Sequence, residues 1–370
     1  MNLVLFFTRG NSLKTWDDVG MFDREVALYK RLQEKGYTIS FVTYGGPSEL
    51  HYQDRIPGIN ILCNKWHLPT FLYQRLIPYL HAPVLCQADL IKTNQTNGAE
   101  LALYAARKWG KPLIARCGYM WSVHADERKG AASPETLRAK KIEERVFGAA
   151  QRVVVTAPMM VNDIAERIPE AKSKTIVIPN YVETDRFSPL DNIEKEYDVL
   201  FLGRFTLQKN IKALLDAVKL LDVKLALIGE GSLKKIFQKE YASLETRIEW
   251  IGRVPNRDLP LYLNKSRIFI LPSFYEGHPK VLLEAMSCGL PVIGANSPGI
   301  REVISHSENG WLCETDSDSI KNAINYLLAN PDLCKTMGEN ARKFALENVS
   351  LDKVIEMEMD VYQSIMRSIS

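Results

Sequence analysis

Short runs of consecutive apolar residues recur along the chain, separated by stretches whose apolar residues are spaced as on one face of a helix. In the first half, the runs NLVLFF, YTISFVTY, KPLIAR and RVVVTA are separated by helical patterns near 20–35, 98–109 and 135–149. Apolar runs without alternation are typical of strands that are covered on both faces. Strands that alternate with helices predict a parallel sheet with helices on both sides.

A second series of strands and helices begins near residue 197. Its expected strands are 197–203, 223–229, 247–252, 267–273, 290–294 and 310–313, and its expected helices lie near 209–221, 232–241, 257–264, 279–288 and 318–329. The segment IVIPNYVETDRFSPLDNIEKEY (176–197) separates the two series and is rich in proline and charge, so we expect a domain linker near 180–195. The predicted fold class is therefore α/β, with two Rossmann-like, doubly wound parallel-sheet domains at 1–180 and 190–350.

Composition and charge limit the class of protein. The 370 residues are 46% hydrophobic and 25% charged, which is ordinary for a soluble globular protein. The net charge of +3 is too small to indicate nucleic acid, and it suits an anionic small molecule or an anionic membrane surface equally well. Six scattered cysteines without a C-x-x-C pair indicate reduced thiols in a cytosolic compartment. The start, MNLVLFFTRG, is unlike a signal peptide, and no apolar run approaches the roughly 20 residues of a spanning helix.

In open α/β sheets, ligands bind beyond the carboxyl ends of the strands, so the loops there carry the chemistry. The loop after 197–203 contains Gly203, Arg204 and Lys209. Two cations beside a glycine and a helix start suit a diphosphate, although a solvated loop has the same composition. The next loop, GEGSLKK, contains Gly231 but has a lysine where a dinucleotide fingerprint has its third glycine, which disfavours a dehydrogenase.

The stretch LPSFYEGHPKVLLEAMSCG contains two glutamates around a helix start. Glu276 lies just before a helix that is expected to have Pro279 at its first position. The free N–H groups at such a helix end suit phosphate or hydroxyl groups. Glu284 lies on the helix, where long side chains lean toward the N-terminus. Alternatively, Lys280, Glu284 and Ser287 form a polar stripe that faces water.

Together these residues resemble the retaining nucleotide-sugar glycosyltransferases of family 4. That family has the GT-B fold, in which two Rossmann-like domains face each other across a cleft. The signature is two glutamates separated by seven residues, within FYEGHPKVLLEAMSCGLPVIG. The stretches GRFTLQKN, LIGEGS, IEWIGRV and VIPNYVETDRF follow in the family's order and spacing. The resemblance is strong in the second half, whereas the first half matches mainly in architecture.

The resemblance implies a nucleotide-sugar site on the second domain and no cofactor or metal. Arg204 and Lys209 would bind the diphosphate as it departs. Glu276 would contact the hydroxyls of the transferred sugar, and Glu284 would accept from the ribose hydroxyls. The remaining residues implied are Gly203, Gly231, Arg253 (in 251–254, which would line the base), Gly277, His278, Pro279 and Lys280. A uridine diphosphate donor is favoured over a guanosine diphosphate donor, and the C-terminal helix 351–370 is expected to pack back on the first domain.

Two positions of the first domain depart from the family pattern. Gly20, in TRGNSLKTWDDVGMFDRE, stands alone where many members have a glycine pair beside the diphosphate. Many members also have a histidine near the sugar, where this chain has IARCGYMWSVHAD. We therefore take His124 as a candidate catalytic group, with a surface or core histidine as the alternative. Cys117 reads better as a small buried residue than as a nucleophile.

Two further segments have alternative interpretations. TDSDSI (315–320) resembles a metal-binding D-x-D, but it is more simply a helix cap. KWHLPTFLYQRLIPYLH (65–81) mixes aromatic residues with Lys65 and Arg75, as in a helix that lies on an anionic membrane near a lipid-linked acceptor. A core helix has a similar composition, and Pro69 and Pro78 interrupt the segment.

The sequence thus predicts retaining transfer of a hexosyl or N-acetylhexosaminyl group from a nucleotide diphosphate sugar to a glycan or lipid-linked acceptor, in polysaccharide or glycoconjugate synthesis. The protein is expected in the cytoplasm, with possible peripheral contact with the inner face of the membrane. One alternative is a nucleotide-sugar epimerase or hydrolase of the same fold, and another is a non-catalytic binding subunit. Glycoside hydrolysis by paired carboxylates does not explain the basic loop.

Overall fold

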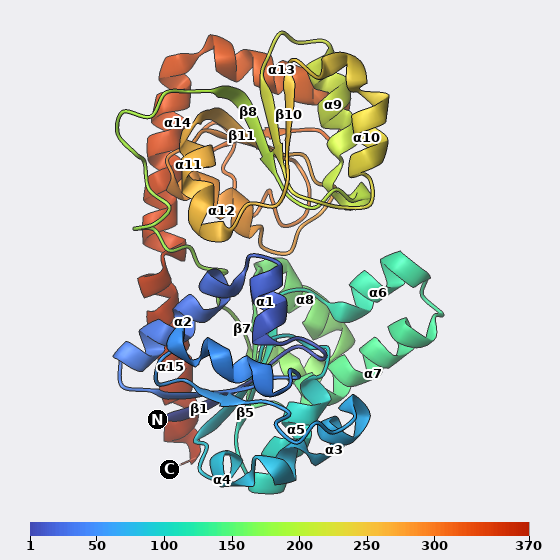
Figure 1. The fold of residues 1–370 in the computed structure, drawn as a ribbon, viewed down its shortest axis with the longest axis vertical. Coiled ribbons are helices and arrows are strands. Elements are labelled where there is room, and N and C mark those ends of the chain that lie inside the picture. Colours follow the sequence, from blue (N-terminus) through green and yellow to red (C-terminus); the bar gives the residue numbers. More distant parts are fainter. Residues whose placement is uncertain (370) are drawn as a thin grey trace. The chain divides into compact units, whose positions relative to one another are not determined.

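The computed structural model describes residues 1–369, which fold into two compact units (Figure 1). The first unit contains Met1–Pro179 together with the C-terminal segment from Ile355 onward. The second unit contains Asn180–Val354. The chain thus returns to its first unit at its end.

The predicted linker 180–195 belongs to the second unit, which starts earlier than the expected residue 190. Nη1 of Arg342 donates to the carbonyl oxygen of Thr184 at 2.8 Å. The backbone N–H of Leu190 donates to Oδ1 of Asn264 at 2.9 Å. Proline and charge are common both in linkers and in extended segments held on a domain surface, so composition alone could not distinguish the two.

A seven-stranded parallel sheet forms the centre of the first unit, in the order β3-β2-β1-β4-β5-β6-β7. The strands are β1 Asn2–Phe6, β2 Thr38–Val42, β3 Asn60–Leu62, β4 Leu90–Thr93, β5 Leu113–Cys117, β6 Arg152–Val155 and β7 Thr175–Val177. The order changes direction between β1 and β4, as in doubly wound sheets. The apolar runs correctly predicted β1, β2, β5 and β6.

Helices cover this sheet. They are α1 Leu13–Asp18, α2 Phe22–Glu34, α3 Thr70–Leu80, α4 Ala82–Leu85, α5 Ala99–Trp109, α6 Trp121–Lys129, α7 Pro134–Ala149, α8 Pro158–Arg167 and α15 Leu351–Ile369, with the short 3-10 helices η1 Pro47–Asp54 and η2 Pro169–Lys174. In α5, Ala102, Leu103 and Ala106 form the buried face. Gly110 ends that helix in the left-handed conformation, with φ of 61°.

The second unit contains a six-stranded parallel sheet in the order β10-β9-β8-β11-β12-β13. Its strands are β8 Tyr197–Leu202, β9 Leu225–Ile228, β10 Ile248–Ile251, β11 Ser266–Leu271, β12 Val292–Ala295 and β13 Trp311–Cys313. Its helices are α9 Ile211–Lys219, α10 Lys234–Glu240, α11 Leu259–Asn264, α12 Lys280–Ser287, α13 Ser317–Ala329 and α14 Pro331–Phe344, with short helices η3 Leu207–Lys209, η4 Ala242–Leu244, η5 Asn256–Asp258 and η6 Ala345–Val349. All six expected strands are present.

Helical spacing explains how the second unit buries its helices. In α9, Ile211, Leu214, Leu215 and Val218 fall at helical spacing and are buried in the core. The cap predicted in TDSDSI is confirmed at α13, where Oδ1 of Asp316 accepts the backbone N–H of Ser319 at 2.9 Å.

The last helix, α15, is attached to the first sheet by a buried ion pair. Nζ of Lys92, on β4, donates to Oε1 of Glu358 at 2.5 Å and to the hydroxyl of Tyr362 at 3.0 Å. Lys92 and Tyr362 have no exposed surface, and Glu358 is 2% exposed. Burial lowers the pKa of Lys92, and the carboxylate of Glu358 opposes this shift. Because Lys92 interrupts the apolar run LIKT, the apolar pattern did not predict β4 as a strand.

The aromatic segment 65–81 includes α3, which buries Tyr73 and Ile77 but leaves Phe71 exposed. The core interpretation therefore holds for the face with Tyr73 and Ile77, and contact of the other face with a membrane stays a prediction. Within residues 1–369, no helix combines the length and apolarity that crossing a bilayer requires.

Candidate functional site

The loop after β8 carries the two predicted cations. Arg204 is exposed, and Lys209 ends the 3-10 turn η3, so that α9 starts two residues later than Lys209. The chain passes from η3 to α9 through Asn210, whose φ of 50° is left-handed. A Cβ at Gly203 would lie 3.7 Å from Cε of Lys209 and only 3.0 Å from the ring of Phe201. A Cβ would therefore crowd the ring of Phe201, whereas its contact with Lys209 would be an ordinary van der Waals contact.

Lys209 and Glu276 form an ion pair across two neighbouring loops. Nζ of Lys209 lies 2.5 Å from Oε1 of Glu276, and the two side chains are 12% and 10% exposed. The residues are 67 positions apart in sequence, and they meet because β8 and β11 are adjacent in the sheet. A cation and a carboxylate thus lie together at the carboxyl end of the sheet.

Hydrogen bonds fix the loop after β8 against the loop after β11. Nε2 of Gln208 donates to the carbonyl of Tyr275 at 2.8 Å, and the N–H of Phe274 donates to the carbonyl of Gln208 at 2.9 Å. Nδ2 of Asn210 donates to the carbonyl of Pro272 at 3.2 Å. Backbone and amide bonds therefore hold the Lys209–Glu276 pair in position, which limits how far either side chain can drift.

The loop after β12 supports the same loop from its other side. The N–H of Glu276 donates to the carbonyl of Pro298 at 2.9 Å, and Oγ of Ser297 donates to the carbonyl of Ser273 at 2.7 Å. Gly299 has a φ of +83°, and a Cβ there would lie 2.2 Å from the carbonyl oxygen of Glu276. The close approach of these two loops therefore requires a glycine at 299.

The N-terminus of α12 lies directly after this loop. Pro279 is the N-cap residue, so the helix starts at Lys280, one position later than predicted, and no side chain caps it. Nζ of Lys280 lies 5.8 Å from the ring centre of Tyr181. Gly277, His278 and Pro279 connect Glu276 to this helix end. The first N–H groups and the partial positive charge of the helix end favour a negative ligand.

Glu284 does not lie on a stripe that faces water. It is 1% exposed, and Ser287 has no exposed surface, so the solvent-stripe alternative is wrong. Nδ2 of Asn256 donates to Oε1 of Glu284 at 3.0 Å, and Asn256 is itself 4% exposed. Oγ of Ser287 donates to the carbonyl of Phe187 at 2.6 Å. Tertiary contacts that helical spacing cannot reveal thus cover this face of α12.

The glycines after β9 are explained by close packing of loops. A Cβ at Gly231 would lie 2.5 Å from the carbonyl oxygen of Phe205, and one at Gly229 would lie 2.0 Å from that of Gly203. Nζ of Lys234 donates to the carbonyl of Gly229 at 3.2 Å and accordingly supports the loop after β9 from within. Close packing therefore explains why glycines occur at 229 and 231, and no bound dinucleotide is needed to explain them.

The segment expected to line the nucleotide base follows β10. Arg253 is exposed, whereas Ile251 and Val254 are partly buried and pack against the core. Nζ of Lys234 also lies 3.5 Å from the carbonyl oxygen of Ile251. The lysine therefore links the ends of β9 and β10, beside which the base is expected.

His278 links the start of the second unit to this site. Its Nδ1 accepts the backbone N–H of Asn180 at 3.2 Å, and Nδ2 of Asn180 donates to the carbonyl of His278 at 2.7 Å. Burial lowers the pKa of His278 to about 4. The imidazole is therefore neutral at pH 7, as an accepting Nδ1 requires.

This burial predicts acid sensitivity of the second unit. The pKa of His278 is about 6.5 in the unfolded chain and about 4 in the folded protein. Between these two pH values the unfolded chain is protonated at His278 and the folded protein is not, so the free energy of unfolding falls as the pH is lowered from about 6.5 to about 4. At pH 5 the loss is about 2 kcal/mol. His278→Asn keeps an acceptor but does not titrate, so its free energy of unfolding should decline less between pH 7 and pH 5. Urea unfolding at both pH values measures this, and equal declines for parent and variant would contradict it.

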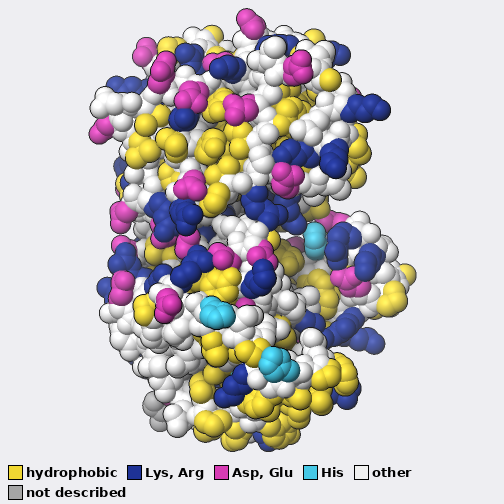
Figure 2. All heavy atoms as spheres, viewed as in Figure 1, with side chains coloured by type: hydrophobic (Ala, Val, Ile, Leu, Met, Phe, Trp, Pro, Cys, Tyr) yellow, Lys and Arg dark blue, Asp and Glu magenta, His cyan; other side chains and the backbone are white. Residues whose placement is uncertain are grey.

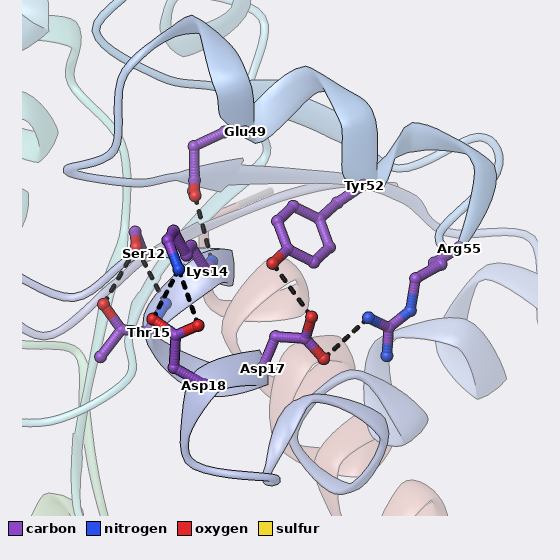
Figure 3. Close-up of polar contacts among 8 residues, drawn as sticks. All are labelled: Ser12, Lys14, Thr15, Asp17, Asp18, Glu49, Tyr52 and Arg55. Atoms are coloured by element: carbon purple, nitrogen blue, oxygen red, sulfur yellow. Dashed lines mark hydrogen bonds and ion pairs between the residues drawn. The ribbon is translucent and has the colours of Figure 1, made fainter.

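In the first unit, helix α1, which ends shortly before Gly20, is held by a network of polar contacts (Figure 3). Glu49, which is 1% exposed, accepts the N–H of Leu13 at 2.8 Å and that of Lys14 at 3.1 Å, so it caps α1. The N–H of Gly20 donates to the carbonyl of Asp17 at 2.8 Å. The amide of Gly20 is thus already used within its own turn, which argues against a diphosphate contact through that amide.

The histidine and cysteine candidates of the first unit differ in environment. His124 lies on α6 with a side chain that is 39% exposed, and its ring centre is 5.8 Å from that of Tyr119. Cys117 has no exposed surface, its Sγ donates to the carbonyl of Tyr119 at 3.0 Å, and burial raises its pKa. A buried thiol with a raised pKa is a poor nucleophile, in agreement with the sequence interpretation.

Sequence reasoning missed three asparagines that support the site. Asn180, Asn210 and Asn256 bond to His278, to the strand-end loops and to Glu284, respectively. Each lies in a loop or at the edge of a short helix, where asparagine is common, so no local signal marks it. Within residues 1–369, no group of three or more His, Cys, Asp or Glu side chains could hold a metal ion.

Comparison with known proteins identifies the class. A family model described as glycosyl transferases group 1 matches residues 183–344, and one described as Glycosyltransferase Family 4 matches residues 26–186. The chain is 30% identical over 362 residues to N-acetyl-alpha-D-glucosaminyl L-malate synthase of Bacillus anthracis, covering 92% of each chain. It is 31% identical over 219 residues to an uncharacterized glycosyltransferase of Methanocaldococcus jannaschii, covering 58% of this chain and 60% of that protein.

Solved structures agree on the fold. Sucrose-phosphate synthase of Thermosynechococcus elongatus superposes with a TM-score of 0.81 at 20% identity, covering 100% of both chains. Anabaena HepE in complex with UDP superposes with a TM-score of 0.78 at 19% identity, covering 98% of this chain and 100% of that one. The two parallel-sheet domains are those of a GT-B glycosyltransferase. The chain belongs to glycosyltransferase family 4.

Proposed function

We propose that this glycosyltransferase moves a hexosyl or N-acetylhexosaminyl group from a uridine diphosphate sugar to a glycan or lipid-linked acceptor, with retention of configuration, in polysaccharide or glycoconjugate synthesis. One observation carries the proposal. The Lys209–Glu276 pair lies at the carboxyl ends of β8 and β11, beside the uncapped N-terminus of α12. This combination offers positive charge to a diphosphate and a carboxylate to sugar hydroxyls.

Each group has a distinct role in the proposed reaction. Lys209, Arg204 and the N–H groups of α12 stabilise the charge that grows on the departing diphosphate. Glu276 orients the sugar by accepting from its hydroxyls. Because Glu276 forms an ion pair with Lys209, a bound diphosphate would compete with Glu276 for the lysine ammonium group. No enzyme nucleophile is needed, because the acceptor attacks on the face that the leaving group vacates and the phosphate oxygen takes its proton.

The remaining residues shape the donor site. Glu284 accepts hydrogen bonds from the ribose hydroxyls, while its Oε1 accepts a hydrogen bond from Nδ2 of Asn256. The backbone of 277–279 contacts sugar and phosphate, and 251–254, with Arg253, lines the base. Gly203, Gly231 and Lys280 border the diphosphate, and His124 is the proposed group of the first unit near the sugar.

Relatives support the donor and acceptor classes. HepE has been crystallised with UDP and with UDP-glucose. An Escherichia coli relative, 25% identical over 296 residues and matched over 74% of this chain and 75% of its own length, is a UDP-Gal:alpha-D-GlcNAc-diphosphoundecaprenol alpha-1,3-galactosyltransferase. A uridine diphosphate donor and a lipid-linked acceptor are therefore the classes that we propose for this chain.

The proposal needs no metal, because two cations and a helix end supply the positive charge. The six cysteines are all free, as expected for a protein that works in the reducing cytoplasm. We further propose that it contacts the inner face of an anionic membrane, where a lipid-linked acceptor is presented.

Two other functions fit the same fold. A nucleotide-sugar epimerase or hydrolase would interconvert or release the sugar without an acceptor. A non-catalytic subunit would bind the donor without turnover. Release or interconversion of the sugar without an acceptor would support the first function, and donor binding without turnover on any acceptor would support the second.

The ribose assignment can be tested by nucleotide binding. The parent should prefer UDP over 2′,3′-dideoxy-UDP by about 1.5–3 kcal/mol, the value of a hydrogen bond to a charged group. Glu284→Ala should lose most of this preference, because the substitution weakens binding of UDP and changes binding of the dideoxy nucleotide little. Calorimetric titration of both nucleotides into both proteins gives the comparison.

Glu240→Ala, which removes an exposed carboxylate of α10, is the control and should keep the full preference. If Glu284→Ala weakens both nucleotides equally, the buried carboxylate only supports the fold around Asn256 and does not bind ribose.

A further inference from the structure

Asn256 carries a buried hydrogen-bond acceptor that has no donor. Its side chain is 4% exposed, and its Nδ2 donates to Oε1 of Glu284 at 3.0 Å. Because a carboxylate accepts hydrogen bonds and does not donate them, the amide nitrogen faces Glu284 and Oδ1 points away from it. In the described part of the chain, residues 1–369, no group donates to this Oδ1. The amide of Asn256 is therefore only half used.

Other buried asparagines of the second unit use both ends of the amide. Asn264 is 5% exposed, its Oδ1 accepts the N–H of Leu190 at 2.9 Å, and its Nδ2 donates to the carbonyl of Pro260 at 2.9 Å. Asn309 accepts the N–H of Ser305 at 2.8 Å and donates to a backbone carbonyl at 3.2 Å. Charged side chains of both signs are scattered over the surface of the second unit (Figure 2), where water can satisfy them. A buried amide depends on protein or ligand partners instead, so the unused acceptor of Asn256 needs an explanation.

A capping role does not explain Asn256. It is the first residue of the short helix η5, whose N-cap is Pro255 and which has no side-chain cap bond. Its only printed side-chain contact is the bond to Glu284, which uses the nitrogen and leaves the oxygen over. The orientation of the amide thus points to a donor from outside the chain.

The position of Asn256 indicates which donor this is. Asn256 comes two residues after 251–254, which are proposed to line the base, and it contacts Glu284, which is proposed to bind the ribose. In a nucleoside diphosphate, the ribose carbon C2′ is bonded to C1′, which carries the base, whereas C3′ is bonded to C4′ on the side of the diphosphate. A residue beside the base segment is therefore nearer to the 2′-hydroxyl than to the 3′-hydroxyl.

We propose that Oδ1 of Asn256 accepts a hydrogen bond from the 2′-hydroxyl of the donor ribose, so that the site selects ribonucleotide sugars over 2′-deoxyribonucleotide sugars. The hydroxyl supplies the donor that Oδ1 lacks, while Nδ2 keeps its bond to Oε1 of Glu284. Asn256 is then a specificity-determining residue that touches the substrate. This inference rests on the proposed function, because it takes the ribose to lie beside Glu284.

The test is calorimetric titration of UDP, 2′-deoxy-UDP and 3′-deoxy-UDP into the full chain. The parent should bind UDP about tenfold more tightly than 2′-deoxy-UDP, because the deoxy nucleotide leaves Oδ1 of Asn256 buried without a donor. Asn256→Ala should reduce this preference to about twofold or less, since it removes the acceptor. The same variant should keep the parent's preference for UDP over 3′-deoxy-UDP, because the carboxylate of Glu284 remains.

Asn264→Ala is the matched control. It also removes a buried amide of the second unit, but one whose hydrogen bonds are all made within the protein, so its preference for UDP over 2′-deoxy-UDP should equal that of the parent. Melting temperatures of both variants confirm that they are folded at the temperature of the titration. A ratio of two affinities in one protein does not depend on the folded fraction, so a partly unfolded variant still reports its preference.

Two results would overturn the proposal while Glu284 keeps its assignment. Asn256→Ala could retain the tenfold preference over 2′-deoxy-UDP, as expected if a buried water satisfies Oδ1. It could also lose the preferences at the 2′ and 3′ positions equally, as expected of a residue that only orients Glu284. A parent that does not distinguish UDP from either deoxy nucleotide gives a different result, because the ribose contact of the proposed function then fails together with that of Asn256.

Discussion

Glu276→Ala is expected to bind UDP at least as tightly as the parent while it releases UDP from the donor sugar roughly 10²–10³-fold more slowly. Binding should not suffer, because removal of the carboxylate frees Lys209, which lies 2.5 Å away, to pair with the diphosphate. Turnover should suffer, because the group proposed to bind Glu276 is the transferred sugar, whose bond to phosphate breaks in the transition state.

Lys209→Ala is the paired comparison and should show the reverse balance, with UDP binding weakened by about 1.5–3 kcal/mol. Calorimetry of UDP and initial rates of UDP release in EDTA give both quantities for each variant. If Glu276→Ala loses UDP as badly as Lys209→Ala does, or turns over at the parent rate, then the roles assigned to the pair are wrong.

Glu358→Ala is expected to destabilise the first unit by about 3–5 kcal/mol, because it leaves the Lys92 ammonium buried without its counter-charge. Replacement of the whole cluster should cost far less. Lys92→Met/Glu358→Leu/Tyr362→Phe removes both charges and the buried hydroxyl together, and such exchanges are often neutral. Urea unfolding of parent, single and triple variants measures the difference.

Glu34→Ala provides the surface control, since its pair with Arg31 at 3.0 Å is largely exposed and should contribute less than about 1 kcal/mol. A Glu358→Ala protein that unfolds at the same urea concentration as the parent would show that α15 is not held by this ion pair. The C-terminal helix would then be attached by its apolar contacts alone.

Apolar runs predicted the architecture where strands are almost wholly apolar. The runs that became β1, β8, β9 and β12 are buried on both faces, so their composition alone marks them. The prediction missed β4, because Lys92 interrupts its apolar run. The buried lysine is stabilised by its ion pair with Glu358, which is 266 residues later in the chain. A contact so distant leaves no local signal.

The sequence indicated which residues make up the candidate site, but it did not show their contacts. The spacing of Glu276 and Glu284 around a helix start indicated a polar ligand site, and the structure adds that Lys209 pairs with Glu276. Helical spacing alone was also compatible with a solvent-facing stripe that contains Glu284 and Ser287, whereas tertiary packing buries both side chains. The side-chain amides of Gln208 and Asn210 bond to the loop after β11, which lies beside their own loop only because β8 and β11 are neighbours in the folded sheet.

The most direct test of the account is a thermal-shift panel of nucleotide sugars in EDTA. UDP-glucose, UDP-N-acetylglucosamine, GDP-mannose and ADP-glucose are each added to the unmodified protein, and the shift in melting temperature is recorded. A uridine diphosphate sugar is expected to stabilise the protein without metal, by about 2.7 kcal/mol at one hundred times its dissociation constant. If no nucleotide sugar raises the melting temperature, or if stabilisation appears only when manganese or magnesium is restored, the proposed donor site is contradicted.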